Sequence, residues 1–105
     1  MEEPNLSYIH SMSGGDKTFE EKLIGIIKKE FPLEKQEYFD NITARNYKRT
    51  AANVHKLKHK ISILGLEKSY EVAVNYEDNL IENKTDGREN FEAILQIMTD
   101  FLKTL

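Results

Sequence analysis

The sequence contains no cysteine among its 105 residues. Disulfide bonds, thiolate zinc sites and thiol nucleophiles are therefore excluded. Long apolar runs are also absent, and short runs such as Ile63–Leu64 cannot span a bilayer. The opening MEEPNLSY is acidic and polar, unlike the basic and then apolar plan of a signal peptide. We therefore expect a reducing, cytoplasmic location and no membrane partner.

Acidic residues are missing from one long segment, residues 43–65, which we call the basic segment. The whole chain has 18 acidic and 15 basic residues and a net charge of −3, but the basic segment alone carries +6, which leaves −9 elsewhere. This separation favours a face that meets an acidic or phosphorylated partner, although a solvated lysine-rich face would look the same. The basic residues of the segment are Arg45, Lys48, Arg49, Lys56, Lys58 and Lys60.

Strand-like alternation is also absent, and nearly every segment has apolar residues at helical spacing. The composition, 39% hydrophobic and 31% charged, is that of a folded rather than a disordered chain. The length suits a single domain covering residues 1–105. We expect an all-α fold, an antiparallel four-helix bundle with a short additional N-terminal helix.

Local signals place the first two helices. The first is expected over residues 5–12 and is broken by the Ser-Gly-Gly of residues 13–15, after which Asp16 can cap the second. Pro32 lacks a backbone N–H, so we expect it to kink or restart that helix. The side chains expected to be buried along the second helix are Phe19, Leu23, Ile26, Ile27 and Phe31.

Three further helices are expected in the remaining sequence. Asn41 or Thr43 should cap the third helix, and Gly65 should end it. The fourth helix should begin near Glu67, with the Lys-Thr-Asp-Gly of residues 84–87 turning into the fifth. The stripe expected to be buried along the third helix is Tyr47, Ala51, Val54, Leu57, Ile61 and Leu64.

Two histidines, His55 and His59, lie one turn apart in the basic segment. At about 100° per residue, His55 falls about a third of a turn from the centre of the apolar stripe, so we expect it to be exposed. Lys58 should neighbour it as a surface cation. A neutral imidazole is a nucleophile near pH 7 and can attack an activated phosphoryl group held by another protein. The residues expected to share the His55 flank are Lys48, Ala52, His59 and Ser62.

Other functions fit the histidines less well. The His55–His59 spacing is that of a helical metal pair, but no carboxylate lies nearby in sequence and the lysines oppose a dication, so we expect no metal site. A hydrolase would need an oriented nucleophile and a cleft, and a small bundle with one exposed histidine supplies neither in any obvious way. A nucleic-acid partner is opposed by the acidic remainder of the chain and by the lack of an arginine and aromatic surface. Two histidines on a solvated surface remain the non-functional interpretation.

The segment around His55 resembles the histidine-containing phosphotransfer (HPt) domains of bacterial two-component phosphorelays. Their signature is a histidine, a leucine and a lysine two and three residues later, and a glycine ten residues after the histidine. Here these positions are His55, Leu57, Lys58 and Gly65. The resemblance extends over most of the chain, to the segments GGDKTF at 14–19, Glu-Phe-Pro at 30–32, Ala73 and Tyr-Glu at 76–77.

The resemblance implies a phosphorelay intermediate without kinase activity of its own, since the chain has no glycine-rich nucleotide loop. A phosphoryl group would pass from a receiver-domain aspartate to the outer ring nitrogen of His55 and then to another receiver. The partners would be receiver domains of response regulators and hybrid histidine kinases. The required Mg²⁺ would belong to the receiver, so no intrinsic cofactor is implied. Lys58 would position the phosphoryl group, whereas Lys56 and Lys60 would act through general electrostatics.

The chain departs from the HPt pattern at His59, where the family usually has glycine. A larger ring here can narrow the choice of partner, contact the phosphoryl group or even accept it, or it can be a tolerated surface substitution. A second class of function also stays open: a non-catalytic helical adaptor that docks an acidic receiver-like protein. We expect a monomer, because the apolar stripes suffice for one bundle.

Overall fold

The computed structural model describes residues 2–105, and within this range the protein is all-α, with five helices and no strand. The all-helical expectation is therefore confirmed. None of the helices in the described range is both long enough and apolar enough to cross a membrane. The helices are α1 (Ser7–Ser13), α2 (Lys17–Thr43), α3 (Tyr47–Ile63), α4 (Glu67–Ile81) and α5 (Arg88–Leu102).

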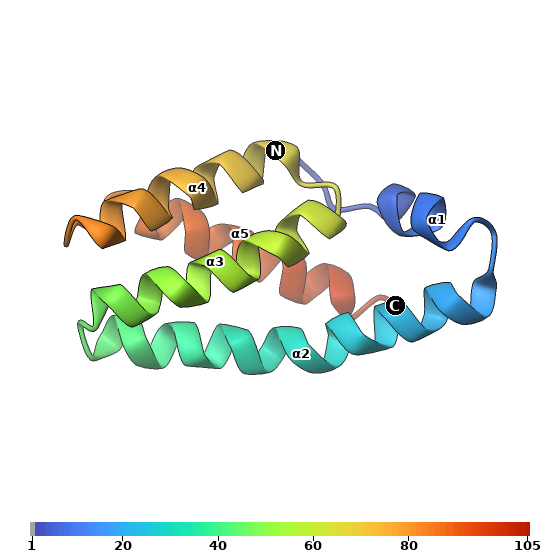
Figure 1. The fold of residues 1–105 in the computed structure, drawn as a ribbon, viewed down its shortest axis with the longest axis horizontal. Helices are drawn as coiled ribbons and strands as arrows, with labels where there is room; N and C mark the ends of the chain where they lie inside the picture. The colour runs from blue at the N-terminus through green and yellow to red at the C-terminus, as the bar shows by residue number, and fades with distance from the viewer. Residues whose placement is uncertain (1) are drawn as a thin grey trace.

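The longest helix, α2, runs along the length of the molecule, which measures 43 × 23 × 19 Å (Figure 1). Helix α3 packs against both α2 and α4, and α5 also contacts α2 and α4. The short α1 packs beside α2 at one end of the molecule. Thus α3, which carries most of the basic segment, is held between two neighbouring helices and keeps its remaining side free.

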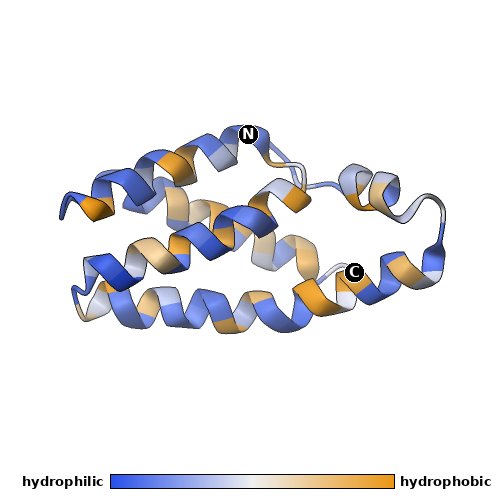
Figure 2. Cartoon of the chain, in the orientation of Figure 1, coloured by the Kyte–Doolittle hydropathy of each residue, from blue (hydrophilic) through white to orange (hydrophobic). Residues whose placement is uncertain are grey.

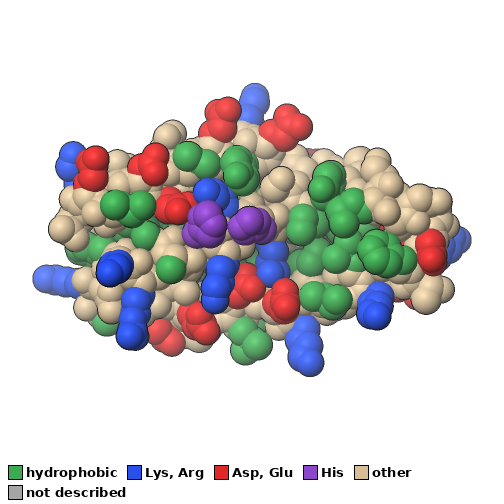
Figure 3. All heavy atoms as spheres, in the orientation of Figure 1, with side chains coloured by type: hydrophobic (Ala, Val, Ile, Leu, Met, Phe, Trp, Pro, Cys, Tyr) green, Lys and Arg blue, Asp and Glu red, His purple; other side chains and the backbone are tan. Residues whose placement is uncertain are grey.

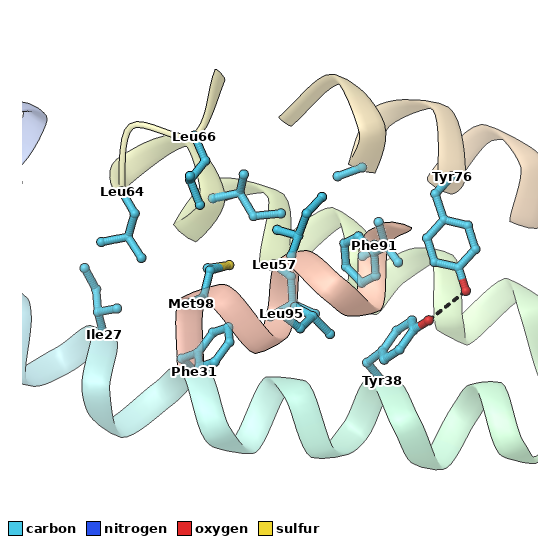
Figure 4. Close-up of a cluster of buried hydrophobic side chains, with 14 of the residues drawn as sticks. Ile27, Phe31, Tyr38, Leu57, Leu64, Leu66, Tyr76, Phe91, Leu95 and Met98 are labelled. Carbon is cyan, nitrogen blue, oxygen red and sulfur yellow. Dashed lines mark hydrogen bonds between the residues drawn. The ribbon is translucent and has the colours of Figure 1, made fainter. Parts of the chain in front are cut away.

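The core receives apolar side chains from every helix. Hydrophobic residues recur at intervals along each helix in Figure 2, as burial of one helical face requires. In the close-up of Figure 4, Phe31 of α2, Leu57 of α3 and Met98 of α5 point into the same interior. Full burial of such a side chain contributes about 1.5–3 kcal/mol. One core residue from each helix in turn is Ile9, Phe31, Leu57, Leu80 and Met98.

Helix α2 differs from the sequence-based expectation in two ways. It continues through Pro32 as one helix, so the expected restart does not occur. Two of the residues expected to be buried, Phe19 and Ile26, are 45% and 44% exposed. Phe19 is exposed because α2 has 27 residues and α3, α4 and α5 have 17, 15 and 15, so the first turn of α2 extends beyond them. Ile26 is exposed because it points about 100° around the helix axis from its neighbour Ile27, which is buried in the core.

The helix caps were predicted in part. Asp16 caps α2 as expected, its Oδ1 accepting a hydrogen bond from the backbone N–H of Phe19 at 3.1 Å. The prediction of Asn41 or Thr43 for α3 was wrong. The residue that caps α3 is Asn46, whose Oδ1 accepts a hydrogen bond from the backbone N–H of Arg49. Asn41 lies inside α2, and its side chain instead donates to Asn53 of α3 at 2.6 Å. The first helix begins two residues later than expected, at Ser7.

A series of hydrogen-bonded polar side chains crosses the interior between three helices. The hydroxyls of Tyr38 and Tyr76 lie 2.7 Å apart, and Tyr38 also donates to Glu92 at 2.9 Å (Figure 4). Arg88 pairs with the same carboxylate at 2.7 Å. Burial raises the pKa of both tyrosines well above the ordinary value, so both hydroxyls stay protonated at neutral pH. The series links α2, α4 and α5 at one level of the fold.

Candidate functional site

His55 lies in the middle of α3 and its side chain is 56% exposed, as its position on the helix predicted. Two histidine side chains lie next to each other at the centre of the face seen in Figure 3, with basic side chains around them. The free side of α3, away from α2 and α4, therefore carries an imidazole that a second protein can reach.

The His55 ring is held by a carboxylate from the neighbouring helix. Its Nδ1 atom lies 3.1 Å from Oε2 of Glu77 on α4. Because an ionised carboxylate only accepts hydrogen bonds, this contact places the ring proton on Nδ1. The lone pair of the neutral ring is then on Nε2, the nitrogen farther from the backbone. The contact thus fixes both the tautomer and the ring orientation.

Lys58 approaches the same carboxylate. Its Nζ lies 3.0 Å from Oε1 of Glu77, and its ammonium group lies 5.6 Å from the centre of the Tyr70 ring. Oε1 of Glu77 is buried and accepts no well-aligned hydrogen bond, so this is a close ion pair rather than a directed bond. The Lys58 side chain is only 13% exposed. The expectation of an open surface lysine is therefore corrected: Lys58 is a partly buried cation, held by α4 beside His55.

The remaining residues expected around His55 are all exposed on α3: Lys48, Ala52, Lys56, His59 and Ser62. The His55 and His59 rings lie 5.3 Å apart between centroids, with an interplanar angle of 79°. The small side chains of Ala52 and Ser62 leave both ends of this pair open to a bulky partner. The structure therefore brings the predicted flank together on one side of the helix.

The basic segment does not form one uniform cationic face. Lys60, expected to act through general electrostatics, is buried and pairs with Glu30 and Glu34 of α2 at 3.1 and 2.9 Å. It lies three residues after Leu57 and next to Ile61, which turns it toward α2. With Lys58 paired to α4, the exposed basic residues of the segment are four: Arg45, Lys48, Arg49 and Lys56.

Apolar side chains are also exposed near the site. In Figure 3 hydrophobic side chains gather on the same face as the histidines, toward the end of the molecule where α1 lies. The large exposed apolar side chains of α1 and the first turn of α2 are Tyr8, Met12 and Phe19. The sequence pattern missed this patch, because it assigned Phe19 to the core.

The described residues, 2–105, contain no group of three or more His, Asp or Glu side chains arranged to hold a metal ion.

The sequence pattern also missed the role of Glu77, which lies 22 residues from His55 in the chain. The sequence offered two signals for it: the Tyr-Glu of residues 76–77 belongs to the resemblance, and a position directly after the core residue Tyr76 places Glu77 at the edge of the buried face of α4.

The chain was compared with protein-family models, curated proteins and solved structures, and none of the three comparisons found a match. The functional interpretation therefore depends on the arrangement of His55, Glu77 and Lys58 and on the resemblance of the sequence around His55.

Proposed function

We propose that this protein is a histidine phosphotransfer protein of a bacterial two-component phosphorelay. It accepts a phosphoryl group on Nε2 of His55 from the aspartyl phosphate of one receiver domain and passes it to another receiver. The observation that carries the proposal is the exposed His55 ring with Nδ1 held by Glu77, because this leaves the outer nitrogen free as a nucleophile. The protein acts in the cytoplasm as a monomer.

This geometry supports a direct transfer of the phosphoryl group. The Nε2 lone pair of His55 attacks phosphorus, an N–P bond forms, and the bond between phosphorus and the aspartyl oxygen breaks. The electron pair of the broken bond stays on that oxygen, which restores the receiver's carboxylate. The imidazole keeps its proton on Nδ1 and becomes positively charged, and the adjacent Glu77 carboxylate stabilises that charge. Transfer to the second receiver reverses these steps.

Lys58 supports the reaction by its charge. Its ammonium group lies 3.0 Å from the Glu77 carboxylate and within one helical turn of His55, so its positive charge can attract the incoming phosphoryl group. The Mg²⁺ that the reaction uses is bound by the receiver, and the chain supplies no ligand set of its own in this proposal. The exposed cations Lys48 and Lys56 favour encounter with the acidic pocket of a receiver.

The proposal takes α2 to α5 as an antiparallel four-helix bundle, with α1 as the additional short helix. The packing of α3 against α2 and α4, and of α5 against the same two helices, supports this arrangement. A rigid bundle suits the function because the acceptor imidazole must keep its position while two different receivers dock in turn.

The experiment that tests the proposal is transfer from a phosphorylated receiver domain in the presence of Mg²⁺. We expect acid-labile, base-stable label on the wild-type chain, retained label in His59→Gln and none in His55→Gln. Both side chains are exposed, so both variants should fold, which circular dichroism can check.

Three other outcomes contradict the proposal in different ways. Label that persists in His55→Gln and disappears in His59→Gln would move the acceptor to His59. Receiver binding without label on any variant would favour the non-catalytic adaptor. Salt-sensitive DNA binding without receiver binding would favour a nucleic-acid function.

A further inference from the structure

We infer that His59 is a second anion-binding group of this site, which in its protonated form holds the phosphoryl group on His55. The inference rests on the proposed phosphotransfer function and goes beyond it, because it makes retention of the phosphoryl group depend on pH. The observation behind it is the contact between the two imidazole rings, whose centroids are 5.3 Å apart.

The direction of the His55 ring favours His59 as the phosphoryl contact. Nδ1 of His55 points toward Glu77 on α4. The two nitrogens of an imidazole point in nearly opposite directions, so Nε2 points away from α4. Residues four apart on a helix lie about 40° apart around its axis, and this turn carries His59 from His55 away from the side of α3 that faces α4. A phosphoryl group on Nε2 therefore extends toward the side where His59 lies.

The distances allow direct contact. A charge-assisted hydrogen bond spans about 2.8 Å, and an exposed side chain changes rotamer freely on a picosecond to nanosecond timescale. The two rings already meet edge-to-face, with an interplanar angle of 79°. Within residues 2–105, His59 has no hydrogen bond or ion pair that a rotation of its ring would break. A small rotation of its ring brings an N–H to a phosphoryl oxygen.

The charges around His59 leave it able to respond to the phosphoryl group. On α3 its charged neighbours are Lys56 and Lys58. From α4, Glu77 is already engaged by His55 and Lys58. From α2, Glu30 and Glu34 are engaged by the buried Lys60. Glu77, Glu30 and Glu34 thus each pair with a side chain other than His59, and a phosphoryl group on His55 would bring a negative charge that His59 can meet.

The sign of the pH effect follows from imidazole chemistry. Protonated His59 attracts the phosphoryl dianion, and neutral His59 adds no charge to the site. Imidazole loses its proton between about pH 5 and about pH 8, so the phosphorylated form gains this stabilisation at the acidic end and loses it as pH rises. The attraction between two exposed charges is weak, and it would change the phosphorylated fraction by about two- to fivefold.

The test measures the fraction of label on this chain at equilibrium with a phosphorylated receiver and Mg²⁺, from about pH 6 to about pH 8. The variants are His59→Gln, which removes the imidazole, and His59→Lys, which keeps a positive charge throughout this range. His10→Gln is the matched control, because His10 is a similarly exposed histidine, on α1, paired with Glu20 rather than His55. Each result is taken as a ratio to wild type, which cancels the pH dependence of the receiver and of the N–P bond.

We expect His59→Gln to retain about two- to fivefold less label than wild type near pH 6 and an equal amount near pH 8. His59→Lys should match wild type near pH 6 and exceed it near pH 8, and His10→Gln should follow wild type throughout. A ratio for His59→Gln that stays at one across the range would overturn the inference while the proposed function stands. Absence of label on every chain would overturn both.

Discussion

Oε2 of Glu77 lies 3.1 Å from Nδ1 of His55, joining α4 to the exposed imidazole of α3. The same carboxylate meets Lys58 through its other oxygen at 3.0 Å. One acidic side chain therefore orients the proposed acceptor ring and neutralises the cation beside it. Glu77 is partly buried, so its negative charge is screened less by water than that of a surface carboxylate.

Glu77→Gln should slow phosphoryl transfer to His55 by about tenfold, because an amide cannot stabilise the positive charge that the ring gains. The bundle should remain folded, since glutamine fills the same volume. The measurement is the rate of label transfer from a phosphorylated receiver. Asp78→Asn is the control, because Asp78 is the next acidic residue on α4 and is exposed. Equal rates for the two variants would mean that Glu77 has no role in transfer.

Lys58→Ala should both slow transfer and destabilise the fold. It removes the partner of a buried carboxylate oxygen and the cation over Tyr70, at a cost of about 1–3 kcal/mol in the free energy of unfolding. Urea denaturation measures this cost. Lys56→Ala, at an exposed position on the same helix, should change the free energy of unfolding by less than about 0.5 kcal/mol. Similar unfolding curves for both variants would show Lys58 to be a free surface cation.

The buried tyrosines predict a loss of stability in alkali. Burial raises the pKa of Tyr38 and Tyr76, so the folded chain keeps protons that the unfolded chain loses near pH 10. This contribution to stability is therefore complete below about pH 10 and decreases as the pH rises above it.

Tyr38→Phe should make that alkaline decrease shallower, and at neutral pH it should cost about 1–2 kcal/mol through the lost hydrogen bonds to Tyr76 and Glu92. Tyr8→Phe, at an exposed tyrosine of α1, should change neither quantity. Urea unfolding across the alkaline range measures both effects. An unchanged slope in Tyr38→Phe would contradict the buried hydroxyl pair.

Gly65→Ala should destabilise the protein by about 1–3 kcal/mol. Gly65 has a φ of +76°, and an added Cβ would lie 2.5 Å from Nδ2 of Asn5. Gly25→Ala is the matched control with the opposite expected effect. Gly25 lies inside α2, where an added Cβ meets no heavy atom within 4 Å, so the free energy of unfolding should rise by about 0.5–1 kcal/mol. Thermal unfolding compares the two, and a shift of both in the same direction would contradict this difference.

Local patterns in the sequence predicted much of the fold because they depend on few neighbouring residues. Helical spacing indicated the all-α class, and Asp16 and Gly65 marked helix ends that the structure has. The prediction failed where equivalent signals compete. Asn41, Thr43 and Asn46 are all suitable caps, but α2 continues to Thr43 and the Asn41 side chain bonds to Asn53, so Asn46 is the residue that caps α3.

The exposure of His55 was determined by the sequence alone, because the position of a residue on a helix relative to the apolar stripe needs only the 3.6-residue period. Which charges surround it was decided by the tertiary structure. Lys58 and Lys60 lie two residues apart, yet one pairs with Glu77 of α4 and the other with Glu30 and Glu34 of α2. These pairs depend on the position of each helix along the axis of its neighbour, and the packing of the whole core sets that position.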